Sequence, residues 1–117
     1  MKQATAQITI DAAHKPYGRV ATETALRLRG KTVPSYNSSV LPNIIVTIKN
    51  IEQVHFSGKK TEQKIYWKHT KYMGNLKETR LADAFAKSPQ KTFTNTVRKM
   101  LPANKHRAIL LRNLRFE

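Results

Sequence analysis

Cysteine is absent from this 117-residue sequence and acidic residues are scarce, with 7 aspartates and glutamates against 22 lysines and arginines. The absence of cysteine excludes disulfide bonds, thiolate catalysis and cysteine-based zinc sites. The scarcity of acids leaves a formal net charge of +15 and little material for a catalytic pair of carboxylates. The composition therefore favours a protein that binds an anionic partner over an enzyme.

Long apolar segments are missing as well. The longest apolar run, residues 44–48, is interrupted by Thr47 and falls far short of the ~20 residues that a membrane span requires. The first seven residues contain no apolar stretch of the kind found in signal peptides. We therefore expect a soluble protein that is not secreted and has no membrane partner.

Patterns for metals, cofactors and small substrates are also weak. The four histidines lie far apart in the sequence, without the spacing of a metal site. Gly58-Lys59-Lys60 is similar to the end of a phosphate-binding P-loop, but Gln53 stands where the first glycine belongs and Lys60 where serine or threonine is needed. We expect no metal, no cofactor and no small-molecule substrate.

One enzymatic alternative stays open. A small enzyme acting on a phosphate-containing ligand could use an α/β scaffold, with Asp11, Gly18 and His69 near strand ends as its site. A free-standing DNA-binding protein is less favoured, because the sequence contains no helix-turn-helix or zinc module.

The positive charge is spread along the chain rather than gathered in a tail. Residues 1–60 carry 9 basic and 3 acidic side chains, and residues 61–117 carry 13 and 4. A protein bound to a membrane surface would concentrate its basic residues on one amphipathic helix. The even distribution instead indicates a polyphosphate partner that contacts one small domain on many sides.

The first half of the chain predicts a strand, a helix and a second strand. Ile8 and Ile10 alternate with polar residues and predict a strand that ends at Asp11. From Arg19 the apolar period becomes helical, and Gly30 stands where a helix C-terminus needs glycine. The β-branched run at 44–48 predicts a strand covered on both faces. This order predicts a parallel βαβ unit and the α/β class.

The second half predicts two more strands and three helices. Strands at 54–56 and 65–67 would form a hairpin or extended loop with two lysines at its tip. A helix begins near Leu81, a second follows Ser88-Pro89 and ends before Pro102, and Asn104 caps a last helix that runs through Leu114. Met100 and Leu101 are predicted to be buried. We treat 1–117 as one domain with its core at about 8–116.

Basic residues in loops and at element ends are the candidate contacts with nucleic acid. Aromatic side chains among them could stack on bases, and Tyr72 is a better candidate for this than Tyr66 or Trp67, which core packing would equally explain. The candidate RNA-binding residues are Lys15, Arg19, Arg29, Lys31, Lys59, Lys60, Lys68, His69, Lys71, Tyr72, Lys77, Arg98, Lys99, Lys105 and Arg107.

Several blocks of the sequence resemble, in order and spacing, the family of large-subunit ribosomal proteins numbered thirteen, in its bacterial form. The matching blocks are Asp11-Ala12, Gly18 to Thr22, Leu28 to Lys31, Ile44 to Val46, Ser57 to Lys60, Lys64 to Thr70, Gly74 to Lys77 and Lys99 to Pro102. The resemblance covers about residues 8–116. The chain departs from the family pattern at Lys71 and Asn75, where glycine is usual, which predicts a different local loop geometry.

The resemblance implies a three-layer α/β/α domain with a mainly parallel central sheet. It also implies a structural component of the large ribosomal subunit that binds ribosomal RNA, supports assembly and catalyses nothing. Its partners would be large-subunit RNA and neighbouring large-subunit proteins. Its location would be the cytoplasm, with an organellar ribosome left open.

Overall fold

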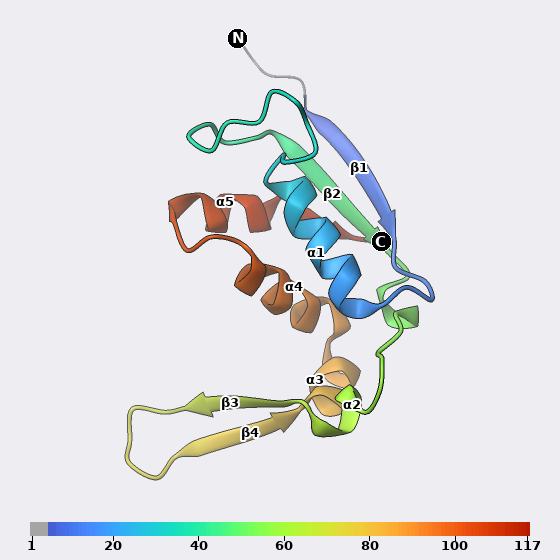
Figure 1. Ribbon diagram of the computed structural model, residues 1–117. Helices are drawn as coiled ribbons and strands as arrows, with labels where there is room; N and C mark the ends of the chain where they lie inside the picture. Colours follow the sequence, from blue (N-terminus) through green and yellow to red (C-terminus); the bar gives the residue numbers. More distant parts are fainter. Residues whose placement is uncertain (1–4) are drawn as a thin grey trace.

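A computed structural model describes residues 5–117, and Figure 1 shows the arrangement of its elements. In chain order they are β1 (Ala6–Asp11), α1 (Tyr17–Leu28), β2 (Ile44–Lys49), the 3-10 helix η1 (Ile51–Gln53), α2 (Lys60–Gln63), β3 (Ile65–His69), β4 (Leu76–Arg80), α3 (Leu81–Lys87), α4 (Pro89–Met100), α5 (Lys105–Arg112) and β5 (Leu114–Phe116). The fold is therefore mixed α/β, as the sequence predicts.

Three strands form a parallel sheet in the order β1-β2-β5. Strand β2 lies in the middle, with Ile8 opposite Val46 on one side and Leu114 opposite Val46 on the other. Its residues Ile44, Val46 and Ile48 are buried, while the alternate residues Ile45 and Thr47 are half-buried. One face of the sheet therefore carries the core, and the predicted parallel pairing of the first two strands is confirmed.

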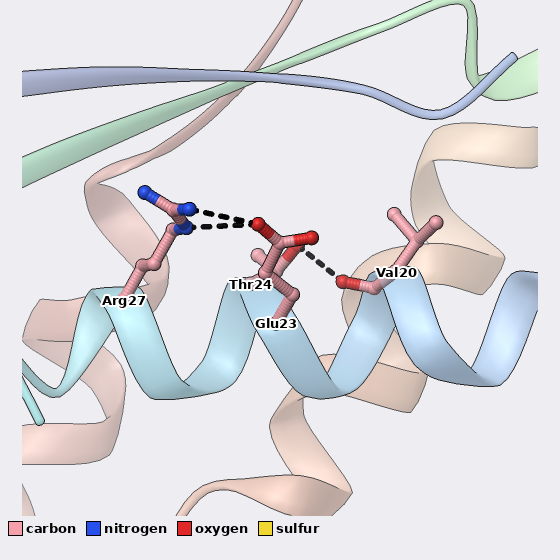
Figure 2. A network of polar contacts seen from close by, with 4 residues as sticks. All are labelled: Val20, Glu23, Thr24 and Arg27. Atoms are coloured by element: carbon pink, nitrogen blue, oxygen red, sulfur yellow. Dashed lines mark hydrogen bonds and ion pairs between the residues drawn. The ribbon is translucent and has the colours of Figure 1, made fainter. Parts of the chain in front are cut away.

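Helix α1 packs its apolar face against this sheet, and the packing matches the sequence prediction. Val20, Ala21, Ala25 and Leu28 are all buried. Thr24 is also buried, but its hydroxyl donates to the Val20 carbonyl at 2.8 Å, so its polar group is satisfied. On the solvent side the Arg27 guanidinium pairs with Glu23 at 2.9 Å (Figure 2), a spacing that stabilises a helix by a few tenths of a kcal/mol.

Gly30 ends helix α1 in the way its position in the sequence predicts. Its φ is +74°, the Gly30 N–H donates to the Arg27 carbonyl, and the Lys31 N–H donates to the Leu26 carbonyl. This pair of hydrogen bonds is the Schellman motif, in which glycine avoids the steric penalty of a left-handed backbone. A Cβ at this position would also lie 3.2 Å from the Pro42 Cβ.

Replacing Gly30 with alanine should therefore lower the free energy of unfolding by about 1 to 2 kcal/mol, measured by urea denaturation. Gly18→Ala is the matched control, because Gly18 lies in the first turn of α1 and a Cβ there meets nothing within 4 Å. That variant should be neutral or more stable by up to about 1 kcal/mol. Equal losses in the two variants would contradict this account of the helix end.

Helix α4 packs against α1 and contributes side chains to the same core. Ser88 caps it by accepting a hydrogen bond from the Lys91 N–H, and Pro89 occupies the first turn, as predicted. Phe93 and Val97 are completely buried. Phe93 makes edge-to-face contacts with Tyr17 and Phe116, at centroid distances of 5.7 and 6.0 Å. Phe93 therefore connects the start of α1 to strand β5.

The prediction that Met100 is buried is wrong. Met100 is 41% exposed, whereas Leu101 is 4% exposed and belongs to the core. The predicted end of the last helix at Leu114 is also wrong. Helix α5 ends at Arg112, and Leu114 is the first residue of strand β5. The leucines at 110, 111 and 114 fit a helical period, but pairing with β2 determines the conformation of the last one.

The predicted hairpin between 54–56 and 65–67 is also wrong. Residues 51–53 form η1, and His55 makes only an isolated parallel bridge to Pro16. Strand β3 pairs instead with β4, antiparallel, with Lys68 opposite Lys77. Gly58 therefore leads into helix α2, and Lys59 and Lys60 are not at a hairpin tip.

The β3–β4 hairpin forms a second sheet that extends away from the parallel one (Figure 1). The radius of gyration, 15.9 Å, exceeds the value of about 13 Å for a compact chain of this length. Lys71 and Asn75 do not have positive φ; in the turn of this hairpin Gly74 does, at +80°. Ordinary residues therefore fit the two positions where the family pattern has glycine.

Candidate nucleic-acid interface

A groove of about 580 Å³ lies where α1, α2, β3 and α4 meet. Its walls include the start of α1, the loop at 55–57 and the last turn of α4. Four basic side chains from four elements or their ends line it: Arg19, Lys60, Lys64 and Lys99. No carboxylate lies among its lining residues. The groove is therefore a site of concentrated positive charge, which attracts anions.

The fold explains why these charges meet. Val20 and Ala21 point into the core, which leaves Arg19 on the outer side of α1. Phe93 and Val97 bury one face of α4 and leave Lys99 exposed on another. Because α1 and α4 pack against the same core, Arg19 and Lys99 line one groove although they are distant in sequence.

Aromatic side chains form part of the groove wall. The rings of Tyr17 and Phe56 lie 4.8 Å apart, and the Tyr17 hydroxyl is 2.8 Å from the Thr96 hydroxyl. The Lys99 ammonium lies 5.6 Å from the centre of the Tyr66 ring, a cation–π distance. Burial raises the pKa of Tyr17 to about 12, and burial also raises the pKa of Tyr66. Both phenols therefore stay neutral near pH 7 and add no negative charge.

The hairpin continues this basic surface. Alternation along an antiparallel strand places Lys64, Tyr66 and Lys68 on one face, and Lys77 lies directly opposite Lys68. Like charges in directly opposite positions destabilise a strand pair. An anion bound between them would relieve that repulsion, so the groove and this face of the hairpin together fit a long polyanion.

The structure brings some predicted site residues together and leaves others apart. Arg19, Lys60 and Lys99 meet in the groove. On or beside the hairpin strands lie Lys68, His69, Lys71, Tyr72 and Lys77. Arg29 lines a smaller hollow of about 280 Å³ and donates to the Tyr36 hydroxyl at 3.3 Å. Lys31 does not line this hollow, but its ammonium lies 6.0 Å from the centre of the Tyr36 ring.

The other predicted residues, Lys15, Lys59, Arg98, Lys105 and Arg107, do not line either hollow. All fifteen predicted residues are exposed except Arg29 and Arg107, which are half-buried. Within residues 5–117 the ion pairs are Arg27 with Glu23 and Lys49 with Glu117. None of the predicted residues belongs to these pairs, so the ion pairs of the described residues leave the groove cations without an acidic partner.

Sequence reasoning missed three contributors to the groove: His55, Lys64 and Tyr17. The period-two alternation Lys64-Tyr66-Lys68 was a usable signal, because it places two cations and an aromatic ring on one face of a strand. Tyr17 and His55 gave no such signal, since the hydrogen bond from the Tyr17 N–H to the His55 carbonyl joins segments distant in sequence.

The residues of the enzymatic alternative do not form a site. Asp11 ends β1 and Gly18 lies in the first turn of α1, whereas His69 ends β3 on the extended hairpin (Figure 1). Hydrogen bonds from the Ala13 N–H and the Asn50 amide lower the pKa of Asp11. Asp11 therefore stabilises the turn after β1.

Residues 5–117 contain no group of three or more histidine, aspartate or glutamate residues arranged to hold a metal ion. None of the helices in this part of the chain combines the length and apolarity needed to cross a membrane.

Comparison with known proteins gives one consistent result. The sequence model of the family described as ribosomal protein L13 matches residues 5–116. The chain is similar to proteins described as large ribosomal subunit protein uL13 in three bacteria. Identity is 39% over 106 residues in Desulfotalea psychrophila, 42% over 106 residues in Clostridioides difficile and 45% over 93 residues in Clostridium botulinum Eklund 17B.

These alignments cover most of the chain and a smaller share of the relatives. They include 91%, 91% and 80% of this chain, and 75%, 74% and 65% of the three relatives in the same order. The matched region includes every element that lines the groove.

Proposed function

This chain belongs to the ribosomal protein L13 family, and from that premise we propose that it is a structural constituent of the large ribosomal subunit that binds ribosomal RNA through the groove and the basic face of the hairpin. One observation carries the assignment of the surface: four cations converge in a groove with no carboxylate in its lining. Family membership indicates a structural protein rather than an enzyme, which removes the enzymatic alternative.

The mechanism follows from charge and shape. Crowded RNA segments repel one another through their phosphates, and lysine and arginine side chains neutralise them by displacing condensed counterions. The groove draws its cations from elements distant in sequence, so it presents them at fixed relative positions. Pro16, Tyr17 and Gly18 line the groove at the start of α1, where the positive end of the helix dipole adds to the field that a phosphate meets.

Other parts of the sequence-based prediction remain proposals. We infer that 1–117 acts as one domain in the cytoplasmic large subunit and that neighbouring large-subunit proteins are further partners. The finer three-layer arrangement is also a proposal: α1 packs on the core face of the sheet, and the second face of β2, where Ile45 and Thr47 are half-buried, is the place for the third layer. Of the candidate residues, those in the groove and on the basic face of the hairpin have the strongest support.

The adjacent residues Lys59 and Lys60 provide a direct test of the groove. Lys60 lines it and Lys59 does not, and both side chains are exposed. Lys60→Ala should lower affinity for large-subunit RNA about fivefold, the equivalent of one charge pair of about 1 kcal/mol in water. Lys59→Ala should change it much less. Filter binding at fixed salt and thermal melting of both variants would measure this.

Equal loss of affinity in the two variants would contradict the assignment of the groove and favour a diffuse electrostatic attraction. Loss of melting temperature in Lys60→Ala would place Lys60 in the stability of α2 rather than in RNA binding.

A further inference from the structure

The two faces of the β3–β4 hairpin differ in chemistry. Lys68 and Lys77 share the face that continues the groove. The opposite face carries Ile65, Trp67 and His69 from β3, across from Arg80, Glu78 and Leu76 of β4. The contact between the Tyr66 ring and the Lys99 ammonium shows that the basic face is turned toward α4. Because side chains alternate along a strand, the face with Trp67 is turned away from α4.

Apart from the half-buried Ile65, that second face is exposed, and an aromatic ring lies at its centre. Trp67 is 57% exposed and Leu76 is 53% exposed. A large aromatic ring in such a position loses the stabilisation that burial would bring. The register places Glu78 directly across from Trp67, with Arg80 and Leu76 at the diagonal positions. The indole is therefore flanked by one acceptor of hydrogen bonds and one cation.

The charge of the whole hairpin and the aromatic ring on this face together indicate the partner. Residues 64–80 carry five basic side chains and one acidic side chain, a net charge of +4. On the face of Trp67 the charges of Arg80 and Glu78 balance, so the excess of positive charge comes from the lysines of the other face and of the turn. That excess attracts a polyanion to the hairpin, and an exposed indole on a hairpin that attracts polyanions fits a nucleobase, whose flat face stacks on aromatic rings whatever its sequence. A protein partner would more commonly meet a surface core depleted of charge.

We propose that Trp67 stacks on an unpaired base of RNA, with Arg80 on the adjacent phosphate and Glu78 accepting a hydrogen bond from a 2′-hydroxyl or an exocyclic amino group. This inference rests on the proposed RNA-binding function and adds a preference for unpaired RNA over duplex. Bases within a duplex are stacked on each other and offer only their edges, so the indole face cannot reach them.

The protein itself provides the probe, because Trp67 is its only tryptophan. Titrating the intact protein with a short single-stranded RNA should quench the fluorescence of Trp67 as a base stacks on it. A duplex RNA of the same length, compared at equal occupancy by anisotropy of a labelled strand, should quench it much less.

Variants then separate stacking from charge. Trp67→Leu should lower affinity for the single strand about 5- to 150-fold, the range reported for loss of one stacked base, and should leave duplex affinity nearly unchanged. Trp67→Phe should recover much of the loss. Met73→Ala is the matched control, because Met73 is fully exposed in the turn of the same hairpin and has no ring; it should bind like the parent protein.

The outcomes distinguish this inference from the one it rests on. If neither RNA binds, the proposed function fails. If both bind, but Trp67 is not quenched and Trp67→Leu has the affinity of the parent, only the stacking site is overturned. Equal quenching by duplex and single strand at equal occupancy would overturn the preference for unpaired RNA.

Discussion

Phe93→Ala is expected to lower the free energy of unfolding by about 3 to 5 kcal/mol, the range for deleting a buried phenylalanine ring. Phe93 is completely buried and contacts both Tyr17 and Phe116. Its loss therefore leaves a cavity between α1, α4 and β5, and denaturant titration would measure the cost. For a domain near 10 kcal/mol of total stability, this is a large share.

Met100→Ala is the matched comparison on the same helix. Met100 is 41% exposed and lies in the groove wall, so its replacement should change the unfolding free energy by less than about 1 kcal/mol. A larger loss for Met100→Ala than for Phe93→Ala would mean that the face of α4 in contact with the core has been assigned incorrectly.

The affinity for RNA is expected to fall steeply with salt. Each phosphate contact contributes about 0.7 to 0.9 to the slope of log affinity against log salt. The four groove cations alone therefore give a slope of about −2.8 to −3.6, and a fourfold rise in salt should weaken binding about 50- to 150-fold through them. Filter binding over a range of salt concentrations would measure the slope.

Replacing Arg19, Lys60, Lys64 and Lys99 together with alanine should reduce the slope by that amount. All four side chains are exposed, so the melting temperature should change little, and circular dichroism would verify this. A slope near zero in the parent protein, or an unchanged slope in the fourfold variant, would exclude phosphate neutralisation in the groove.

Elements with a strong apolar period could be predicted from the sequence, and those without one could not. Strands β1 and β2 and helices α1 and α4 each bury a periodic set of residues, such as Val20 and Leu28 or Phe93 and Val97. Strand β4 has no such set, because all five of its residues are exposed. Its pairing with β3 depends on the turn around Gly74 and on register.

The candidate site followed the same rule. Arg19, Lys60 and Lys99 could be named one by one from composition and position. Their convergence depends on the packing of α1 and α4 against a common core, which no local pattern encodes. The incorrect hairpin assignment had a similar cause. Val54 is an apolar residue that is buried beside η1, and in the sequence it cannot be told from an apolar residue of a buried strand.

The position of the hairpin outside the core has an energetic consequence for binding. A two-stranded hairpin is marginally stable by itself in water, and in this one only Ile65 and Tyr66 are half-buried while the other strand residues are exposed. Local opening of the hairpin therefore requires little free energy. Binding of RNA fixes the hairpin in place, and the loss of conformational entropy must be offset by the free energy of the contacts that the RNA makes. A polyanion that contacts only one face gains less, so the weak internal stability of the hairpin favours the RNA that fits it on both sides.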